Sequence, residues 1–176
     1  MSYINTIWQA IETWYDKQGA AEVLWPGATE ADIARLESEL GVQISEDLRV
    51  SLLRHNGSAD DAWPEGELLS VDQILANTSQ LRSNVAAGDF NNDHLGDPQL
   101  LPHYWADGWI CISRDGAGNS SAVDMTPGDE GTTGQVLDMD HEVGPSYLYR
   151  SYGDWLQAQY ELLIDAKWTG DYLEIT

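Results

Sequence analysis

The stretch from Trp105 to Val136, WADGWICISRDGAGNSSAVDMTPGDEGTTGQV, contains the clearest strand and turn patterns in the chain. Trp109–Ile112 is an apolar run of aromatic and β-branched residues, which favours a buried strand. Arg114–Asn119 supplies a turn, because glycine and asparagine tolerate positive φ. Ser121–Met125 then predicts a returning strand, and Gln135–Leu137 a third. Such an antiparallel meander must bury its apolar face against other elements.

Helical periodicity and capping residues predict the elements that cover this sheet. Five helices are expected, bounded by Ser2 and Gly19, by Thr29 and Gly41, by Ser45 and His55, by Ser70 and about Leu81, and from Ser151 through Leu163. Leu68–Leu69 and Tyr147–Tyr149 predict short strands, and Tyr172–Ile175 a terminal edge strand. Asn84–Leu100 is the longest expected loop. The prediction is one α+β domain over residues 1–176, with a central, mostly antiparallel sheet flanked by helices.

The charge balance limits the kinds of partner. Eight Lys and Arg residues stand against 30 Asp and Glu residues, a formal net charge of −22. Such a surface repels nucleic acid and anionic membranes and attracts basic proteins; the alternative is that the charge only keeps the protein soluble. No secretory signal and no run long enough to span a bilayer are apparent, so the expected location is the cytoplasm.

Residue types that carry chemistry are sparse. Cys111 is the one cysteine, which excludes an intramolecular disulfide, and its apolar neighbours predict a buried, inert thiol. His55 at a helix end favours a structural role over a catalytic one, and the other histidines lack a ligand-like spacing. No catalytic motif is present. We therefore expect no catalytic residues, no metal and no cofactor.

One acidic loop resembles part of a calcium-binding loop. Asp89, Asn91 and Asp93 match its first three ligand positions. However, His94 stands where the sharp-turn glycine is needed, and Leu100 stands where the bidentate glutamate should be. A solvated acidic loop is the expected structure.

Acidic loops carry the candidate partner-binding residues. They are Asp60, Asp61, Trp63, Glu65, Asp89, Asp93, Asp97, Asp129 and Glu130. Tryptophan is enriched at interface hot spots, so an exposed Trp63 would anchor a basic partner. The alternative for Trp63 is that its ring folds back to cover a helix end.

Several segments, in order, resemble the SMI1/KNR4 family of the SUKH superfamily over roughly Ile4–Ile164. The resemblance rests on ADIARLESELGV at 31–42, RHNG at 54–57, LLSVDQI at 68–74, WICISRDGAGN at 109–119 with VDMTP and GQV after it, and SYGDWL at 151–156. The family usually has a Leu-Pro pair where this chain has Ile44-Ser45. Serine is itself a good N-cap, so the following helix is still expected.

The resemblance implies an α+β domain and no catalytic residues. Bacterial members of the family look like immunity proteins that bind and neutralise a toxin, often a nuclease, whereas fungal members regulate cell-wall synthesis through protein contacts. Immunity against a basic toxin is the first hypothesis, and a regulatory scaffold is the second. A metal-assisted enzyme is the third, supported only by the incomplete calcium-like loop and the scattered histidines. The oligomeric state stays open, since an edge strand at Tyr172–Ile175 could pair with a second copy.

Overall fold

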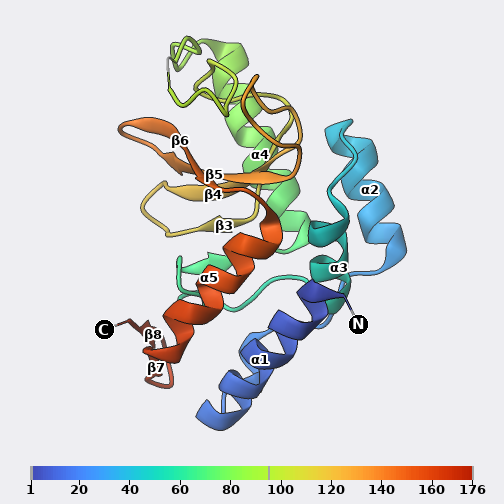
Figure 1. Ribbon diagram of the computed structural model, residues 1–176, viewed down its shortest axis with the longest axis vertical. Coiled ribbons are helices and arrows are strands. Elements are labelled where there is room, and N and C mark those ends of the chain that lie inside the picture. The colour runs from blue at the N-terminus through green and yellow to red at the C-terminus, as the bar shows by residue number, and fades with distance from the viewer. Residues whose placement is uncertain (1, 95, 176) are drawn as a thin grey trace.

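Figure 1 shows a computed structural model of the chain, which describes residues 2–94 and 96–175. The elements in order are α1 (Tyr3–Gln18), the 3-10 turn η1 (Ala21–Val23), α2 (Glu30–Leu40), α3 (Glu46–Arg54), β1 (Glu67–Leu68), α4 (Val71–Ala87), β2 (Trp109–Cys111), β3 (Ser113–Arg114), β4 (Ser120–Asp124), β5 (Gln135–Asp140), β6 (Gly144–Tyr149), α5 (Tyr152–Ile164), β7 (Lys167–Trp168) and β8 (Leu173–Glu174). The predicted α+β architecture is confirmed. No helix in the described residues is both long and apolar enough to cross a membrane.

The central sheet is the predicted meander with one more strand. Its order is β2-β4-β5-β6, and every neighbouring pair is antiparallel. Val123 lies opposite Ile110 on one side and Val136 on the other, and all three side chains are buried. The strand continues past Ile112 as β3, which pairs with β1. The Ile112 carbonyl accepts a 3.0 Å hydrogen bond from the Leu69 N–H, so the two ladders are joined there.

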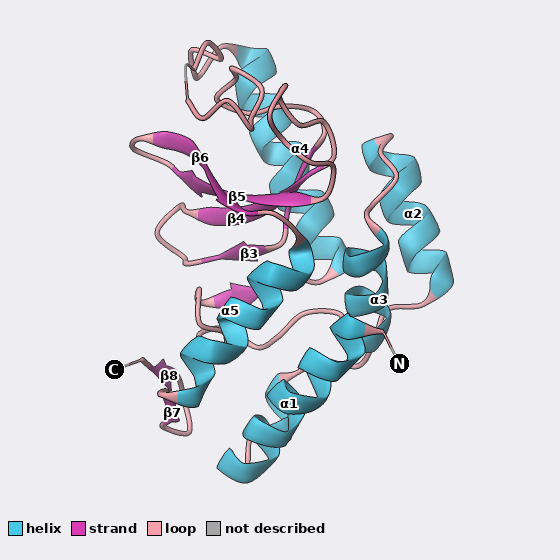
Figure 2. Cartoon of the chain, in the orientation of Figure 1, coloured by secondary structure: helices cyan, strands magenta, loops and turns pink. Residues whose placement is uncertain are grey.

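The five helices begin at the predicted caps, and α1, α2 and α3 also end at theirs. The side chains of Thr29 and Ser70 each accept a hydrogen bond from the third residue of their helix and form a capping box. Gly19 and Gly41 end α1 and α2 in the left-handed conformation. Figure 2 shows α1 and α5 lying side by side. α4 follows the outer edge of β2, where Thr78 Oγ1 accepts a 3.1 Å hydrogen bond from the Cys111 N–H.

One predicted helix end and one predicted strand pairing were wrong. α4 continues to Ala87 instead of ending near Leu81, because the intervening residues include no helix breaker and the left-handed cap is Gly88. The segment Tyr172–Ile175 does not join the central sheet. Its residues Leu173–Glu174 form β8, which pairs only with β7 in a separate hairpin.

A row of tryptophans crosses the core between α1 and α5. The ring of Trp63 lies between Trp8 and Trp155, at centroid distances of 5.7 and 6.1 Å. Ser51 pairs with two polar atoms beside this row, because it accepts a 2.9 Å bond from Trp8 Nε1 and lies 2.7 Å from the Tyr152 hydroxyl. The loop that carries Trp63 is therefore fixed to both helices by its buried ring.

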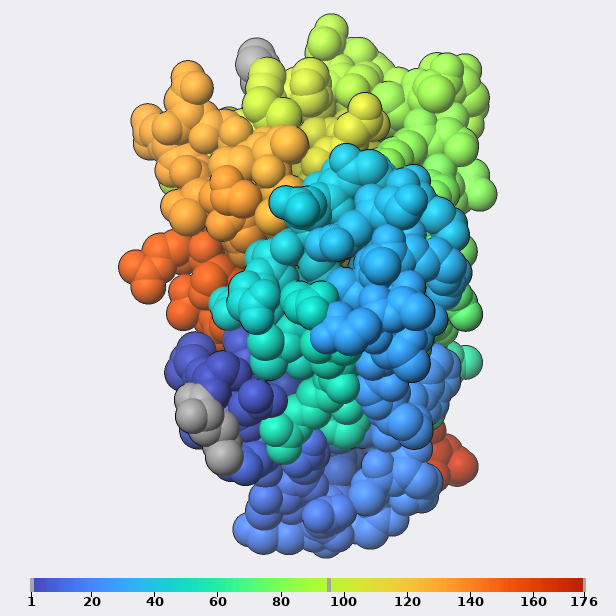
Figure 3. Space-filling view, turned by 90° about the vertical axis from the view of Figure 1, so that its right-hand side faces the viewer, coloured from blue at the N-terminus to red at the C-terminus, as the bar shows by residue number. Residues whose placement is uncertain are grey.

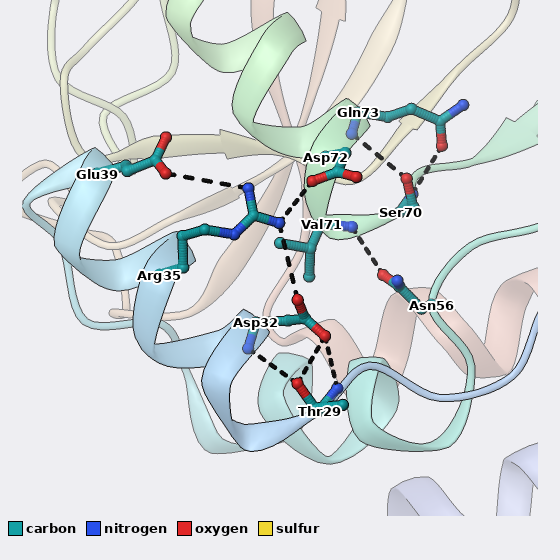
Figure 4. A network of polar contacts seen from close by, with 9 residues as sticks. All are labelled: Thr29, Asp32, Arg35, Glu39, Asn56, Ser70, Val71, Asp72 and Gln73. Carbon is teal, nitrogen blue, oxygen red and sulfur yellow. Dashed lines mark hydrogen bonds and ion pairs between the residues drawn. The ribbon is translucent and has the colours of Figure 1, made fainter.

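α2 is tied to the start of α4 by polar contacts at the surface (Figure 4). Arg35 lies 2.5 Å from Asp72 across the two helices and 3.8 Å from Asp32 within its own helix. The Asn56 side chain accepts a 2.7 Å hydrogen bond from the Val71 N–H at the first turn of α4. In the space-filling view, α2 and α3 cover much of the face turned to the viewer (Figure 3). These contacts set the position of α4, which forms one wall of the cleft described next.

Candidate functional site

An open cleft of about 540 Å³ lies between α4, the loop 58–66 and the turn that joins β3 to β4. Asp60 and Asp61 line it from the loop. The remaining lining residues are Gly66 and Glu67 beside β1, Asn77, Gln80 and Leu81 on α4, and Arg114, Asp115, Gly116, Gly118, Asn119 and Ser120 around the turn. We call this feature the acidic cleft, since four of its lining side chains are the carboxylates Asp60, Asp61, Glu67 and Asp115.

A smaller hollow of about 210 Å³, the side hollow, adjoins the same turn. It shares Arg114, Asp115, Asn119 and Ser120 with the acidic cleft. Its other lining residues are Glu65, Ser113, Ser121, Asp138 and Asp140. The β3–β4 turn therefore borders two hollows that are both rich in carboxylates.

The β3–β4 turn is held by its own polar groups. The Asp115 carboxylate accepts hydrogen bonds of 2.7 Å from the Ala117 N–H and 3.0 Å from the Asn119 N–H. Burial by itself raises the pKa of Asp115, but these hydrogen bonds together outweigh it and hold the pKa below its usual value. Gly116 and Gly118 have φ values of 75° and 111°, as the predicted turn requires. A charged aspartate is thus fixed between the two hollows.

Arg114 is the one basic side chain that lines either hollow. The register places Arg114 directly opposite Glu67, and Arg114 Nε donates a 2.5 Å hydrogen bond to Glu67 Oε2. The Glu67 side chain is 6% exposed, whereas that of Arg114 is 40% exposed. The guanidinium of Arg114 therefore neutralises a buried carboxylate in the wall and leaves the outer carboxylates without a cation from within the lining.

Asp138 has an electrostatically unfavourable position in the side hollow. Burial raises the pKa of its carboxyl group, and the negative charges of Glu65, Asp140 and Asp115 raise it further. Asp140 lies two residues along the same strand, but hydrogen bonds from the Val143 and Glu142 N–H groups lower its pKa. A cation placed in the side hollow would relieve the repulsion at Asp138.

The predicted partner-binding residues of the loop 58–66 divide into two kinds. Asp60 and Asp61 are exposed and line the acidic cleft. Trp63 is only 1% exposed, which contradicts an exposed Trp63 and agrees with the alternative in that its ring folds back onto the protein. The acidic residues around Trp63 suggested exposure, but its ring packs against Trp8 and Trp155, which are distant in sequence.

Glu65 also points into the protein. Its carboxylate accepts hydrogen bonds from the hydroxyls of Ser113 and Ser121, from Trp155 Nε1 and from Gln159 Nε2. One carboxylate thus connects the loop 58–66 with β3, β4 and α5. Glu65 lines the side hollow, but these four donors already occupy its oxygens.

The other predicted partner-binding residues lie outside both hollows, around the long loop that follows α4. Asp89, Asp93, Asp129 and Glu130 are exposed, and Asp97 is half-buried. The Glu130 N–H donates a 3.2 Å hydrogen bond to the Pro98 carbonyl, so the turn 127–131 packs against this loop. Asp97 Oδ2 accepts a 2.6 Å hydrogen bond from the Tyr147 N–H on the outer side of β6. The long loop lies at the top of the view in Figure 1.

Sequence reasoning missed Glu67, Arg114, Asp115, Asp138 and Asp140 as site residues. Asp138 and Asp140 alternate along one strand, and this period of two indicates a shared face. The pairing of Glu67 with Arg114 depends on a register between segments 47 residues apart, which no local pattern reveals.

The side chains of Cys111 and His55, which could in principle be reactive, are held in structural positions. Cys111 is fully buried, and burial raises the pKa of its thiol to about 12. His55 caps α3, with Nδ1 2.9 Å from the Trp25 carbonyl and Nε2 2.9 Å from Glu12 Oε1. Within residues 2–94 and 96–175, no group of three or more His, Cys, Asp or Glu side chains has an arrangement that could hold a metal ion.

The fold and the two hollows define the class of protein: an α+β domain whose open concave surface is lined by carboxylates. Residues 27–158 match the model of the SMI1 / KNR4 family (SUKH-1), and the chain belongs to this family.

Two of the relatives are named as regulatory proteins. The chain is 28% identical to the cell wall biosynthesis/cell cycle regulator smi1 of Schizosaccharomyces pombe, over 96% of this chain and 38% of that protein. It is 25% identical to the glucan synthesis regulatory protein of Neurospora crassa, over 96% of this chain and 40% of that protein. A KNR4/SMI1 homolog of Yarrowia lipolytica is 25% identical over 80% of this chain and 28% of that protein. The chain therefore spans less than half the length of these relatives.

Proposed function

We propose that this chain is a protein-binding regulatory domain of cell-wall synthesis, and that its acidic cleft receives a basic segment of the partner. The observation that carries the proposal is the cleft itself. Carboxylates from the loop 58–66, from β1 and from the β3–β4 turn line it, and its one cation, Arg114, is already paired with Glu67. The names of the fungal relatives support the regulatory role and the link to the cell wall.

Size and charge both favour a peptide segment as the ligand. A volume of about 540 Å³ lies within the usual range for ligand sites and admits a few side chains. The net charge of −22 attracts a cationic partner before contact, which mainly raises the association rate. Exposed carboxylates such as Asp60 and Asp61 are screened by salt. Binding that weakens as the ionic strength rises is therefore expected.

Toxin immunity remains the second candidate function, and the net charge is the observation that favours it. Nuclease toxins are positively charged where they hold phosphates, so an acidic domain can cover that surface. The sequence placed immunity first. The relatives' names reverse this order, because they describe regulators of cell-wall and glucan synthesis.

The test is a comparison of partners captured by three forms of the tagged chain from lysate of its own host, eluted with rising salt. The first form is wild type, the second is Asp60→Asn/Asp61→Asn, and the third is the matched control Asp129→Asn/Glu130→Gln, which removes the same charge elsewhere. We expect proteins of cell-wall synthesis to be captured by the wild type and the control and lost from the cleft variant. Capture of a single basic toxin would replace regulation with immunity. Equal capture by all three forms would contradict binding in the cleft.

A further inference from the structure

The C-terminal hairpin β7–β8 stands apart from the central sheet, beyond the end of α5 in Figure 1. Its turn is closed by Thr169, whose hydroxyl donates a 2.9 Å hydrogen bond to the Tyr172 carbonyl and accepts a 3.1 Å bond from the Tyr172 N–H. Gly170 has a φ of 107°, which the tight turn requires. The hairpin is therefore an ordered unit with its own internal hydrogen bonds.

This hairpin contacts the loop that borders the acidic cleft. The Leu173 N–H donates a 2.9 Å hydrogen bond to the Asp61 carbonyl, and the side chains of Trp168 and Leu173 pack partly buried against the core. Asp61, Trp63, Pro64, Gly66, Tyr172 and Leu173 together line a hollow of about 370 Å³. Asp61 and Gly66 also line the acidic cleft. The same short segment thus separates the hairpin from the cleft.

Asp61 has an unusual backbone conformation at this position. Its φ is 54°, and it is the one non-glycine residue with positive φ in the described part of the chain. Non-glycine residues adopt this conformation at an energetic cost, so surrounding contacts must maintain it. The N–H of Ala59 bonds to the Val23 carbonyl, and Trp63 is fixed by its buried ring, so both sides of the loop are anchored in the core. The tip between them carries two further backbone hydrogen bonds: the Ala62 N–H bonds to the Ala59 carbonyl at 3.4 Å within the loop, and the Leu173 N–H of the hairpin bonds to the Asp61 carbonyl.

We propose that the β7–β8 hairpin is a clasp that holds Asp61 in its left-handed conformation and so fixes the acidic edge of the cleft. While the hairpin is docked, Asp60 and Asp61 keep the positions in which they line the cleft. Release of the hairpin lets the tip at 60–61 relax to ordinary backbone angles. In so far as the cleft binds a basic segment, which rests on the function proposed above, hairpin docking and ligand binding stabilise each other.

The first test needs no ligand and measures backbone hydrogen exchange in the full chain. Leu173→Pro removes the N–H that bonds to Asp61, while the matched control Glu174→Gln changes the neighbouring exposed side chain and keeps that N–H. We expect exchange at residues 59–63 to accelerate by about tenfold or more in Leu173→Pro and to stay at the wild-type rate in the control. Exchange in the central sheet should not change. Unchanged exchange at 59–63 in Leu173→Pro would overturn the clasp.

A second variant covers the case in which proline disturbs the hairpin turn as well. Trp168→Ala/Leu173→Ala keeps every N–H but removes the side chains that pack against the core. The clasp requires that exchange rise together in residues 59–63 and in the hairpin. A hairpin that exchanges freely beside an unchanged loop would contradict it.

The third measurement tests the coupling with octalysine as the basic probe. Saturating octalysine should slow exchange of the hairpin in the wild-type chain, and Leu173→Pro should weaken octalysine binding by about threefold to tenfold, because linkage is reciprocal. Octalysine that binds without slowing hairpin exchange overturns the coupling. If octalysine does not bind the wild type, the cleft proposal fails, while the clasp is still judged by exchange at 59–63.

Discussion

Glu65 and Asp138 are two carboxylates of the same side hollow with opposite environments. Glu65 accepts hydrogen bonds from two serines of the sheet and from Trp155 and Gln159 of α5. Asp138 faces the negative charges of Glu65, Asp140 and Asp115, and its pKa is raised by burial and by these charges. The acidic residues of this chain therefore do not all have the same role. Some carboxylates are structural, and others lie among like charges and reduce stability; the proposed basic partner would meet the second kind.

The largest expected effect is the loss of the structural carboxylate. Glu65→Ala leaves two hydroxyls, an indole N–H and an amide without their acceptor, so the free energy of unfolding should fall by about 3–4 kcal/mol. Glu65→Gln keeps one acceptor oxygen and should cost about half as much. Urea denaturation followed by tryptophan fluorescence measures both, with the exposed Glu22→Gln as control. A loss below about 1 kcal/mol for Glu65→Ala would contradict the structural role of the Glu65 carboxylate.

A second structural carboxylate, Glu12, adds a pH dependence. Hydrogen bonds from Arg54, at 2.6 and 2.8 Å, are the main reason that the pKa of Glu12 is lowered, and His55 contributes as well. A lowered pKa in the folded state gives stability that is present above the unfolded pKa and is lost as the pH falls through the folded pKa. Glu12→Gln should therefore destabilise the chain by about 1–2 kcal/mol at pH 7. The difference between wild type and variant should shrink as the pH falls below about 4.

Asp138→Asn should have the opposite sign. Because the folded pKa of Asp138 is raised, its favourable contribution is present below the unfolded pKa and is lost as the pH rises through the folded pKa. At pH 7 the charged carboxylate reduces stability. We therefore expect the free energy of unfolding of the asparagine variant to be higher than that of wild type by roughly 0.5 kcal/mol. Denaturation curves at pH 7 and pH 4 should show the gain only at pH 7. Destabilisation of Asp138→Asn at pH 7 would show that the Asp138 carboxylate is structural, like that of Glu65.

An effect of similar size, on binding, is expected at Arg114. Arg114→Gln removes the one cation that lines the two hollows and leaves Gln73 Nε2 as the remaining side-chain donor to Glu67. Octalysine should then bind about threefold more tightly, the usual scale of one partly exposed charge. Arg150→Gln removes the same charge from an exposed side chain outside both hollows and is the control. An equal gain in octalysine affinity in both variants would show that the affinity depends only on the net charge of the chain.

The fold was largely predictable because its signals are local. Capping residues such as Thr29 and Ser70, the apolar stripes and the turn at Arg114–Asn119 each act within a few residues. Where no such signal existed, prediction failed: α4 passes Leu81 because nothing there stops a helix, and β8 pairs with β7 instead of the sheet.

The site was predictable only in part. Exposed loop residues such as Asp60 and Asp61 could be proposed from polarity alone. The burial of Trp63 and the inward position of Glu65 depend on rings and donors brought by α1 and α5. These contacts are non-local, so a sequence pattern that groups Trp63 and Glu65 with their acidic neighbours misplaces both.

The most direct test of the acidic cleft is a calorimetric titration of octalysine into three forms of the chain at low salt. These are wild type, Asp60→Asn/Asp61→Asn, and the charge-matched Asp129→Asn/Glu130→Gln, whose sites lie outside both hollows. Asparagine tolerates the left-handed conformation of Asp61, so the first variant should keep the backbone. We predict that the cleft variant binds at least about tenfold more weakly than wild type while the charge-matched variant binds within about twofold of it. Equal weakening in both variants, or none in either, would contradict a specific basic-segment site in the acidic cleft.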